Sequence, residues 1–311
     1  MSTTKPHVIL NPTAGSGRAG KLRTEILSGI QARFGKDYTS DVTQQMGDAT
    51  ESARRAIEAG AGLVIAIGGD GTINETVNGF YKDGELLNPS CELGIIDCGS
   101  GSGLALSLNL PTELEQQLDL IKNEDSCAID LGRVIARTQE NESVERIFAS
   151  ECQVGIGGAV VAEVSSAHKR IGGKAAFGLF SLKQAFVYKA KLTTVRLGDG
   201  EEIAKPLLGL AIGNGDCTAG GMKLTPGAEL NDGLLDVLLM HDMNIPTILW
   251  HFSKIYKGTH VDTPHVSIYR SNKFSIDSAS PVPVSADGEL LGVTPCEFEL
   301  LPAVLKVRCS L

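Results

Sequence analysis

A glycine-rich loop near the N-terminus matches two nucleotide-binding signatures at once. In NPTAGSGRAGKL, residues 11–22, Gly15, Gly17 and Gly20 form G-x-G-x-x-G, and the same letters contain G-x-x-x-x-G-K. Each signature lacks a part, because Leu22 stands where a P-loop needs a hydroxyl for Mg²⁺ and the next strand does not end in the acid that bonds a ribose. The loop is either another kind of phosphate-proximal turn or a flexible strand-to-helix connection.

A second glycine-rich turn, GGDGT at residues 68–72, follows a fully apolar strand and leads directly into a helix. Glycine lets backbone amides approach an anion, and a helix N-terminus favours phosphate at that point. Thr72 can cap the helix or contact a phosphate oxygen. Asp70 would repel phosphate unless it binds a cation, accepts a proton or bonds a ribose hydroxyl. The turn predicts a phosphate site with Asp70 as a candidate catalytic residue.

A carboxylate pair late in the chain could supply a base. SADGELLG places Asp287 and Glu289 on either side of a glycine, in a tight turn that could direct a carboxylate into a cleft. Phosphoryl transfer needs such a base near the acceptor hydroxyl. The alternative is an ordinary Asp-Gly hairpin turn between two strands.

The elements that must position these residues fall into two patterns. In the first third, apolar runs alternate with helical patterns, which predicts an α/β domain with a doubly wound parallel sheet. The expected strands are 7–10, 38–45, 62–69 and 92–97, and the expected helices are 18–33, 48–60, 72–81 and 103–122. Asp48 is the expected N-cap of the second helix.

Beyond about residue 128 the pattern changes to hairpin-like strands, which predicts a β-sandwich-like or barrel domain with inserted helices. The expected strands are 129–137, 144–154, 192–198, 206–213, 234–240, 266–276 and 297–308, and the expected helices are 158–169, 174–190 and 244–257.

The composition limits the class of protein. The 311 residues suit two domains, and the net charge of −9 argues against a dedicated nucleic-acid binder. With no signal peptide and no apolar run of 18 residues or more, we expect a cytoplasmic protein. Seven scattered cysteines without a C-x-x-C pair are expected to be free thiols, and the six histidines form no metal-binding pattern.

Several motifs together resemble the diacylglycerol kinase and sphingosine kinase family of lipid kinases. GGDGTINE is similar to its G-G-D-G-T-x-N-E signature. The resemblance continues, in the family's order, through NPTAGSGRA, VTQQMGDATESA, GSGSGLALSL, LTPGAELNDGLLDVLL and ADGELL. It therefore spans nearly the whole chain.

The resemblance implies an ATP-dependent lipid kinase with an NAD-kinase-like N-terminal domain and a β-rich C-terminal domain, the nucleotide lying between them. It implies a nucleotide-binding domain of residues 1–128, joined by 298–311, and a lipid-substrate domain of residues 129–297. The implied ATP contacts are Asn11, Thr43, Gly68, Gly69, Asp70, Gly71, Thr72, Ile73, Asn74 and Ser100. Glu289 matches the family's proposed base, with Asp287 close by. The family pattern also implies Mg²⁺ held by Asp232 and the carbonyls of Glu229 and Leu234, in competition with a solvated turn.

The sequence departs from the family in GSGSGLA. Ser102 replaces an asparagine, and Gly103 replaces an aspartate or alanine. Ser100 keeps a hydroxyl that a phosphate could use, but a side-chain amide is lost. The departure is compatible with a kinase whose nucleotide or acceptor preference has changed, and with a nucleotide-sensing protein without catalysis. An NAD(P)-dependent oxidoreductase is a further alternative.

The acceptor lipid is expected at a membrane surface, and one segment is suited to reach it. Residues 164–198 contain no acid, but residues 169–196 carry basic and aromatic side chains. Such a segment predicts peripheral contact with an anionic membrane, and a helix packed on the β-rich domain is the alternative. The lipid itself and the choice between monomer and homodimer are left open.

Overall fold

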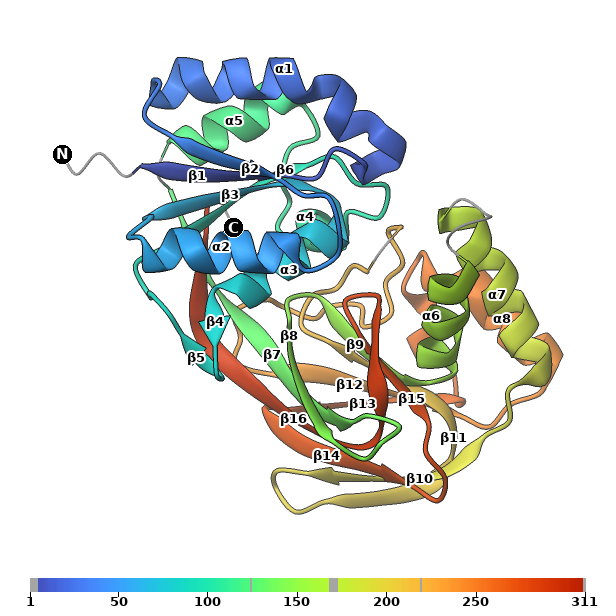
Figure 1. Cartoon of the computed structure of the whole chain (residues 1–311). Helices are drawn as coiled ribbons and strands as arrows, with labels where there is room; N and C mark the ends of the chain where they lie inside the picture. Colours follow the sequence, from blue (N-terminus) through green and yellow to red (C-terminus); the bar gives the residue numbers. More distant parts are fainter. Residues whose placement is uncertain (1–4, 124, 168–172, 219, 310–311) are drawn as a thin grey trace. The chain divides into compact units, whose positions relative to one another are not determined.

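The computed structural model describes residues 5–123, 125–167, 173–218 and 220–309 (Figure 1). The chain forms two compact units. The first comprises Met1–Asp130 and Pro302–Leu311, and the second comprises Leu131–Leu301.

A parallel sheet forms the centre of the first unit. Its strands run in the order β2-β1-β3-β6, and the end of β16 continues it beside β6 through the pairs Lys306–Glu92 and Val307–Leu93. The bounds are β1 (Pro6–Leu10), β2 (Thr39–Val42), β3 (Leu63–Gly68), β6 (Glu92–Asp97) and β16 (Glu289–Val307). A short antiparallel pair, β4 (Tyr81–Lys82) and β5 (Glu85–Leu86), lies apart from this sheet.

Helices cover both faces of the parallel sheet, so the expected doubly wound arrangement is present. α1 (Ala14–Phe34) and α5 (Leu114–Lys122) pack together on one face, and α2 (Asp48–Glu58) and α3 (Asp70–Gly79) lie on the other (Figure 1). All six residues of β3 are buried, as coverage of both faces requires. Burial of each Leu or Ile side chain stabilises the folded state by about 1.5–3 kcal/mol relative to an exposed side chain.

Two expectations for this unit were wrong. The predicted helix 103–122 is two helices, α4 (Gly103–Ser107) and α5. Asn109 has a left-handed φ of 51°, and Pro111 follows without an amide hydrogen, so the first helix cannot continue. Asp48 is the first residue of α2 rather than its cap, and its carboxylate accepts hydrogen bonds from the amides of Gln44 and Gln45.

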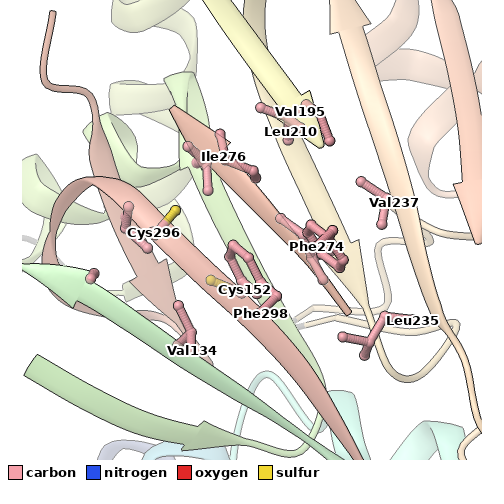
Figure 2. Close-up of a cluster of buried hydrophobic side chains, with 14 of the residues drawn as sticks. Val134, Cys152, Val195, Leu210, Leu235, Val237, Phe274, Ile276, Cys296 and Phe298 are labelled. Carbon is pink, nitrogen blue, oxygen red and sulfur yellow. The ribbon is translucent and has the colours of Figure 1, made fainter. Parts of the chain in front are cut away.

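The second unit is built from antiparallel strands around a large apolar core, with two smaller buried clusters beside it. Figure 2 shows that core, where side chains such as Val134, Leu210 and Phe298 gather between the strands. Phe298 stacks on Phe274 at 4.7 Å and meets Phe148 edge to face at 6.4 Å. The bounds are β7 (Cys127–Arg137), β8 (Ser143–Phe148), β9 (Glu151–Gly155), β10 (Lys191–Leu197), β11 (Glu202–Gly213), β12 (Leu235–His241), β13 (Val266–Ser271), β14 (Lys273–Ser278) and β15 (Pro283–Ala286).

In the described part of this unit, three α-helices and one 3₁₀ turn are inserted among the strands. They are α6 (Ile156–Ala167), α7 (Gly173–Val187), α8 (Ile245–Ile255) and η1 (Thr259–Asp262). Asn244 caps α8 by accepting the amide of Thr247 at 3.0 Å. No helix in the described part of the chain is both long and apolar enough to cross a membrane.

Two predicted strands are each divided in two. The strand expected at 144–154 is interrupted between β8 and β9, because the amides of Ala149 and Ser150 donate to the carboxylate of Asp287. The strand expected at 266–276 ends where the chain changes partner, since β13 pairs with β12 whereas β14 pairs with β10 and β16.

Candidate functional site

The predicted nucleotide residues lie in loops that follow β1, β2, β3 and β6. β2 lies on one side of β1 in the sheet, whereas β3 and β6 lie on the other. The order in which strands are added therefore reverses between β1 and β3, which is a topological switch point. The carboxyl ends of parallel strands at such a switch point form a crevice where ligands commonly bind.

Asn11 joins the loops on the two sides of this switch point. Its Nδ2 donates to Thr72 Oγ1 at 2.9 Å, and its Oδ1 accepts from the amide and the hydroxyl of Thr13 at 3.0 and 2.8 Å. Thr72 lies inside α3, which has Gly69 as its N-cap, so of the two roles open to Thr72 only contact with a phosphate oxygen remains. Thr43 lies nearby, because its amide donates to the carbonyl of Leu10 at 3.0 Å.

The first turn of α3 presents backbone amides at this edge. The first bond within the helix runs from the amide of Ile73 to the carbonyl of Gly69 at 3.0 Å, so the amides of Gly71 and Thr72 precede the helical ladder. Ile73 is 1 % exposed and Asn74 is 2 % exposed. Both of these side chains are therefore buried.

Asp70 links this turn to the loop that follows β6. Its Oδ1 accepts the amide of Gly103 at 2.7 Å. The two loops also touch through glycines, since a Cβ added at Gly99 would lie 2.7 Å from the Cα of Gly69. Only residues without side chains allow this approach.

The loop after β6 contains the departure from the family pattern. Ser102 has a left-handed φ of 60°, a conformation that asparagine tolerates better than serine. Its hydroxyl donates to Asp97, whose other oxygen accepts the amide of Gly99 at 2.9 Å. Ser100 is exposed in the same loop. Sequence reasoning missed Asp97, because a single acid at the end of an apolar strand carries no spacing signal.

The N-terminal glycine loop is a left-handed turn. Gly15, Ser16 and Gly17 have φ values of 59°, 59° and 85°, so the regular part of α1 begins after them, as the expected helix 18–33 does. A Cβ at Gly15 would lie 2.0 Å from the carbonyl oxygen of Cys98, whereas a Cβ at Gly17 would meet nothing within 4 Å. The loop therefore rests directly against the chain that follows β6.

Arg18 is exposed at the end of this turn and close to Cys98. Burial raises the pKa of the Cys98 thiol, and the positive charge of Arg18 opposes that rise. Arg18 forms no ion pair with the described carboxylates. Arg18 is a candidate phosphate contact that the glycine spacing of the loop did not predict.

In the second unit, the Asp-Gly-Glu stretch forms the two-residue hairpin turn that was the alternative interpretation. Ala286 pairs with Glu289, and Asp287 and Gly288 have φ values of 43° and 80°. The turn also makes specific contacts. Asp287 Oδ2 accepts the amide of Ala149 at 2.8 Å, and its Oδ1 accepts those of Ser150 and Glu151 at 3.0 and 2.9 Å. Asp287 therefore fixes the segment between β8 and β9.

Asn214 fixes the same segment from its other side. Its Nδ2 donates to the carbonyl of Ala149 at 2.8 Å, and its amide donates to the carbonyl of Ser150 at 2.9 Å. Asn214 is fully buried. Its function was not evident from sequence, because an isolated asparagine between glycines looks like any turn residue.

Glu289 differs from Asp287 in its surroundings. Its carboxylate pairs with Arg146 of β8, and its side chain is 25 % exposed. Glu289 therefore keeps a partly exposed carboxylate in the second unit, held by the guanidinium of Arg146 in β8.

The predicted metal residues lie around β12. Asp232 accepts the amide of Leu234 at 3.0 Å and pairs with Arg270. Asp236 is 7 % exposed, its Oδ2 has no hydrogen-bond partner in the structure, and burial together with the charge of Glu229 raises its pKa to about 6. Among the described residues no three His, Cys, Asp or Glu side chains are grouped to hold a metal. Arg270 already brings a positive charge to both acids, because it pairs with Asp232 and its Nε lies 3.5 Å from Asp236 Oδ1. A metal ion here would have to displace that guanidinium and would bind backbone carbonyls together with Asp236 Oδ2.

An apolar pocket of about 100 Å³ lies between the sheet and helices α6, α7 and α8. Val160, Phe177, Leu208, Met240 and Ile248 are among the residues that line it. Strand β9 carries a polar pair at this place, since Gln153 lines the pocket and its Nε2 donates to both carboxylate oxygens of Glu151 at 3.0 Å. The amide of Glu151 donates in turn to Asp287. One strand thus connects the apolar pocket with the Asp-Gly-Glu turn.

Comparisons with known proteins agree with the sequence motifs. Residues 5–134 match the diacylglycerol kinase catalytic domain, and residues 151–309 match the YegS C-terminal NAD kinase beta sandwich-like domain. The second match confirms the expected β-sandwich-like fold of the C-terminal half.

Similar proteins with known names cover nearly the whole chain. A "Diacylglycerol kinase" of Staphylococcus carnosus is 26 % identical over 94 % of this chain and 91 % of its own. A "Probable lipid kinase YegS-like" protein of Chromohalobacter salexigens is 30 % identical over 85 % of this chain and 79 % of its own. A diacylglycerol kinase structure from Bacillus anthracis has a TM-score of 0.72 at 20 % identity, covering 99 % of this chain and 97 % of its own, and supports the fold.

Proposed function

We propose that this chain, which belongs to the family of diacylglycerol kinases and YegS-like lipid kinases, transfers the γ-phosphate of ATP to a lipid hydroxyl. The observation that carries the proposal is the convergence of Asn11, Thr43, Thr72 and the Asp70 turn at the carboxyl ends of the parallel strands. The names of the relatives favour a diacylglycerol as acceptor.

In this proposal the first unit holds the nucleotide. The amides of Gly71 and Thr72 and the guanidinium of Arg18 bind phosphate oxygens, because a helix N-terminus and a cation both favour anions there. Asn11 keeps the two loops in register. Asp70 is the proposed residue that would orient Mg²⁺ bound with the nucleotide, and such an ion would neutralise phosphate charge.

The second unit holds the acceptor. Glu289 accepts the proton of the lipid hydroxyl. The hydroxyl oxygen forms a bond to the γ-phosphorus, and ADP leaves. Asp287 is assigned a positioning role, because both of its oxygens already accept backbone amides. The pocket among α6, α7 and α8 takes part of a lipid chain, since its lining is almost entirely apolar.

The experiment that tests the proposal uses γ-labelled ATP and a total lipid extract. We expect label in a lipid product, with diacylglycerol, a sphingoid base, a ceramide and an isoprenoid alcohol then compared as purified acceptors. ATP binding without any labelled lipid would favour a nucleotide-sensing protein. A thermal shift with NADH but none with ATP and Mg²⁺ would favour an oxidoreductase.

We also propose that Mg²⁺ binds beside Asp232 and Asp236 with the carbonyls of Glu229 and Leu234 as further ligands. Asp236 has a folded pKa of about 6, above its ordinary value of 3.8. The native state therefore holds more protons than the unfolded state between these values, and stability falls as pH rises from about 4 to 6. A cation would relieve the carboxylate charge that remains above pH 6.

Millimolar Mg²⁺ is therefore expected to raise the melting temperature by about 2 °C or more at pH 7.5, and by less at pH 5. Asp236→Asn should abolish this increase. Asp242→Asn, which removes an exposed acid of the same unit, should keep it. Differential scanning fluorimetry measures both. An equal Mg²⁺ effect in wild type and Asp236→Asn would contradict the site.

A further inference from the structure

The outer faces of α7 and α8 expose large apolar side chains to solvent. Leu179, Leu182 and Phe186 of α7 are 53 %, 46 % and 57 % exposed. Leu249 and Trp250 of α8 and Tyr256 just after it are 38 %, 50 % and 59 % exposed. We call these six residues the α7–α8 face. The two helices pack against each other, as Figure 1 also indicates.

Both helices follow the same pattern. Residues 179, 182, 183 and 186 form one exposed stripe at helical spacing, and residues 246, 249, 250 and 253 form another. The opposite faces are buried, because Phe177 and Ser181 of α7 and Ile248 and Phe252 of α8 line the apolar pocket. Each helix is thus apolar both toward the pocket and toward solvent, which packing within this unit alone does not explain.

The helices that carry this face are poor in acids, although the exposed Asp242 and Asp262 flank α8, and Asp262 lines the same surface hollow as Trp250. In a chain with 37 acids among 311 residues, no acid occurs at positions 164–198 or 243–261. Lys189 and Lys257 are exposed, and Lys254 lies 3.9 Å from the ring centroid of Trp250. Lys183 adds less positive charge to this face, because its ammonium group pairs with Glu163 at 2.8 Å. Of the other cations in the segment predicted from sequence, Lys169 and Arg170 lie outside the described residues.

We propose that the α7–α8 face docks this protein on an anionic lipid bilayer. Exposed Leu, Phe and Trp side chains insert at the boundary of headgroups and acyl chains, and unpaired lysines attract anionic headgroups to a protein whose net charge is otherwise −9. The inference rests on the proposed lipid kinase function. It deepens that function by placing the wall of the acceptor pocket at the membrane, so that a lipid can pass between the two helices without crossing water.

The chain contains one tryptophan, Trp250, and it lies on this face. Its emission therefore reports docking directly. With full-length protein and vesicles of phosphatidylcholine containing 30 % phosphatidylserine, we expect a blue shift and co-sedimentation, both weakened by high salt. Vesicles of phosphatidylcholine alone should bind at least tenfold more weakly. Equal binding to both vesicles, or no blue shift on binding, would overturn the proposal.

A pair of matched variants separates the face from general surface hydrophobicity. Phe186→Ser with Leu249→Ser removes two exposed apolar side chains from the face and should weaken vesicle binding at least tenfold. Met46→Ser with Ile268→Ser removes two exposed apolar side chains elsewhere and should bind as wild type does. Circular dichroism checks that all variants fold. Unchanged binding by the first pair would overturn the proposal.

A parallel assay of lipid phosphorylation in detergent micelles keeps the two proposals distinguishable. The Phe186→Ser, Leu249→Ser pair should keep most of its micellar turnover while losing vesicle binding. Wild-type turnover in micelles without vesicle binding would refute the docking face alone. Vesicle binding without phosphorylation of any lipid would refute the kinase and leave the docking face standing.

Discussion

Replacing Glu289 with glutamine is expected to lower the rate of lipid phosphorylation by about 10²- to 10⁴-fold, the usual contribution of a positioned general base. The amide keeps the size of the side chain but cannot accept the hydroxyl proton. ATP affinity should stay within about threefold, because Glu289 belongs to the second unit whereas the proposed phosphate contacts belong to the first. Turnover with a purified lipid acceptor and calorimetric ATP titration measure the two quantities.

Glu299→Gln is the matched control. Glu299 lies in the same strand β16 and also pairs with an arginine, Arg133 of β7 instead of Arg146 of β8. Its replacement removes an equivalent ion pair outside the turn, so turnover should remain near that of wild type. If both variants lose activity equally, the loss reflects the broken ion pair and Glu289 is not the base. Full turnover in Glu289→Gln would refute the assignment outright.

Gly15→Ala is expected to weaken ATP binding at least about tenfold and to destabilise the first unit. The new methyl group would lie 2.0 Å from the carbonyl oxygen of Cys98, so the loop after β1 or the loop after β6 must move. Alanine at a φ of 59° also costs about 1–2 kcal/mol. Both loops take part in the proposed nucleotide site, which links the steric conflict to affinity. Isothermal titration with ATP and thermal unfolding measure the two effects.

Gly17→Ala tests whether strain alone explains such a loss. Gly17 has a φ of 85°, but a Cβ there meets no atom within 4 Å. This variant should lose about 1 kcal/mol of stability and bind ATP nearly as wild type does. If Gly17→Ala weakens ATP binding as much as Gly15→Ala, the contact between the two loops does not determine affinity.

The parallel sheet could be predicted from sequence because its signal is local. Strands such as 63–68 are apolar at every position, and each is followed by a helical pattern, so few other folds are compatible. The divided strands could not be predicted in this way. The gap between β8 and β9 depends on Asp287, which lies 137 residues after Ser150 in the sequence. No window of neighbouring residues contains that information.

In the candidate site too, local sequence signals could be predicted and long-range contacts could not. Glycine spacing identified the turn at 68–72 and the Asp-Gly-Glu motif, since both are contiguous. Asp97, Arg18 and Asn214 became candidates only through their contacts with loops far away in sequence. The two roles proposed for Asp287 and Glu289 could likewise not be told apart from the motif alone, because they differ in their contacts: Asp287 accepts backbone amides, whereas Glu289 pairs with an arginine.

The attachment of Asp287 to the segment between β8 and β9 has an evolutionary consequence. Glu289 is placed by backbone pairing and by a part-buried carboxylate–amide junction, whereas half of the residues that line the apolar pocket belong to helices that take no part in this junction. Mutations in those helices can alter the shape of the pocket while Glu289, the proposed base, stays in place. If the proposed function holds, acceptor preference and phosphoryl-transfer chemistry are separable traits in this scaffold, and selection can change one without rebuilding the other.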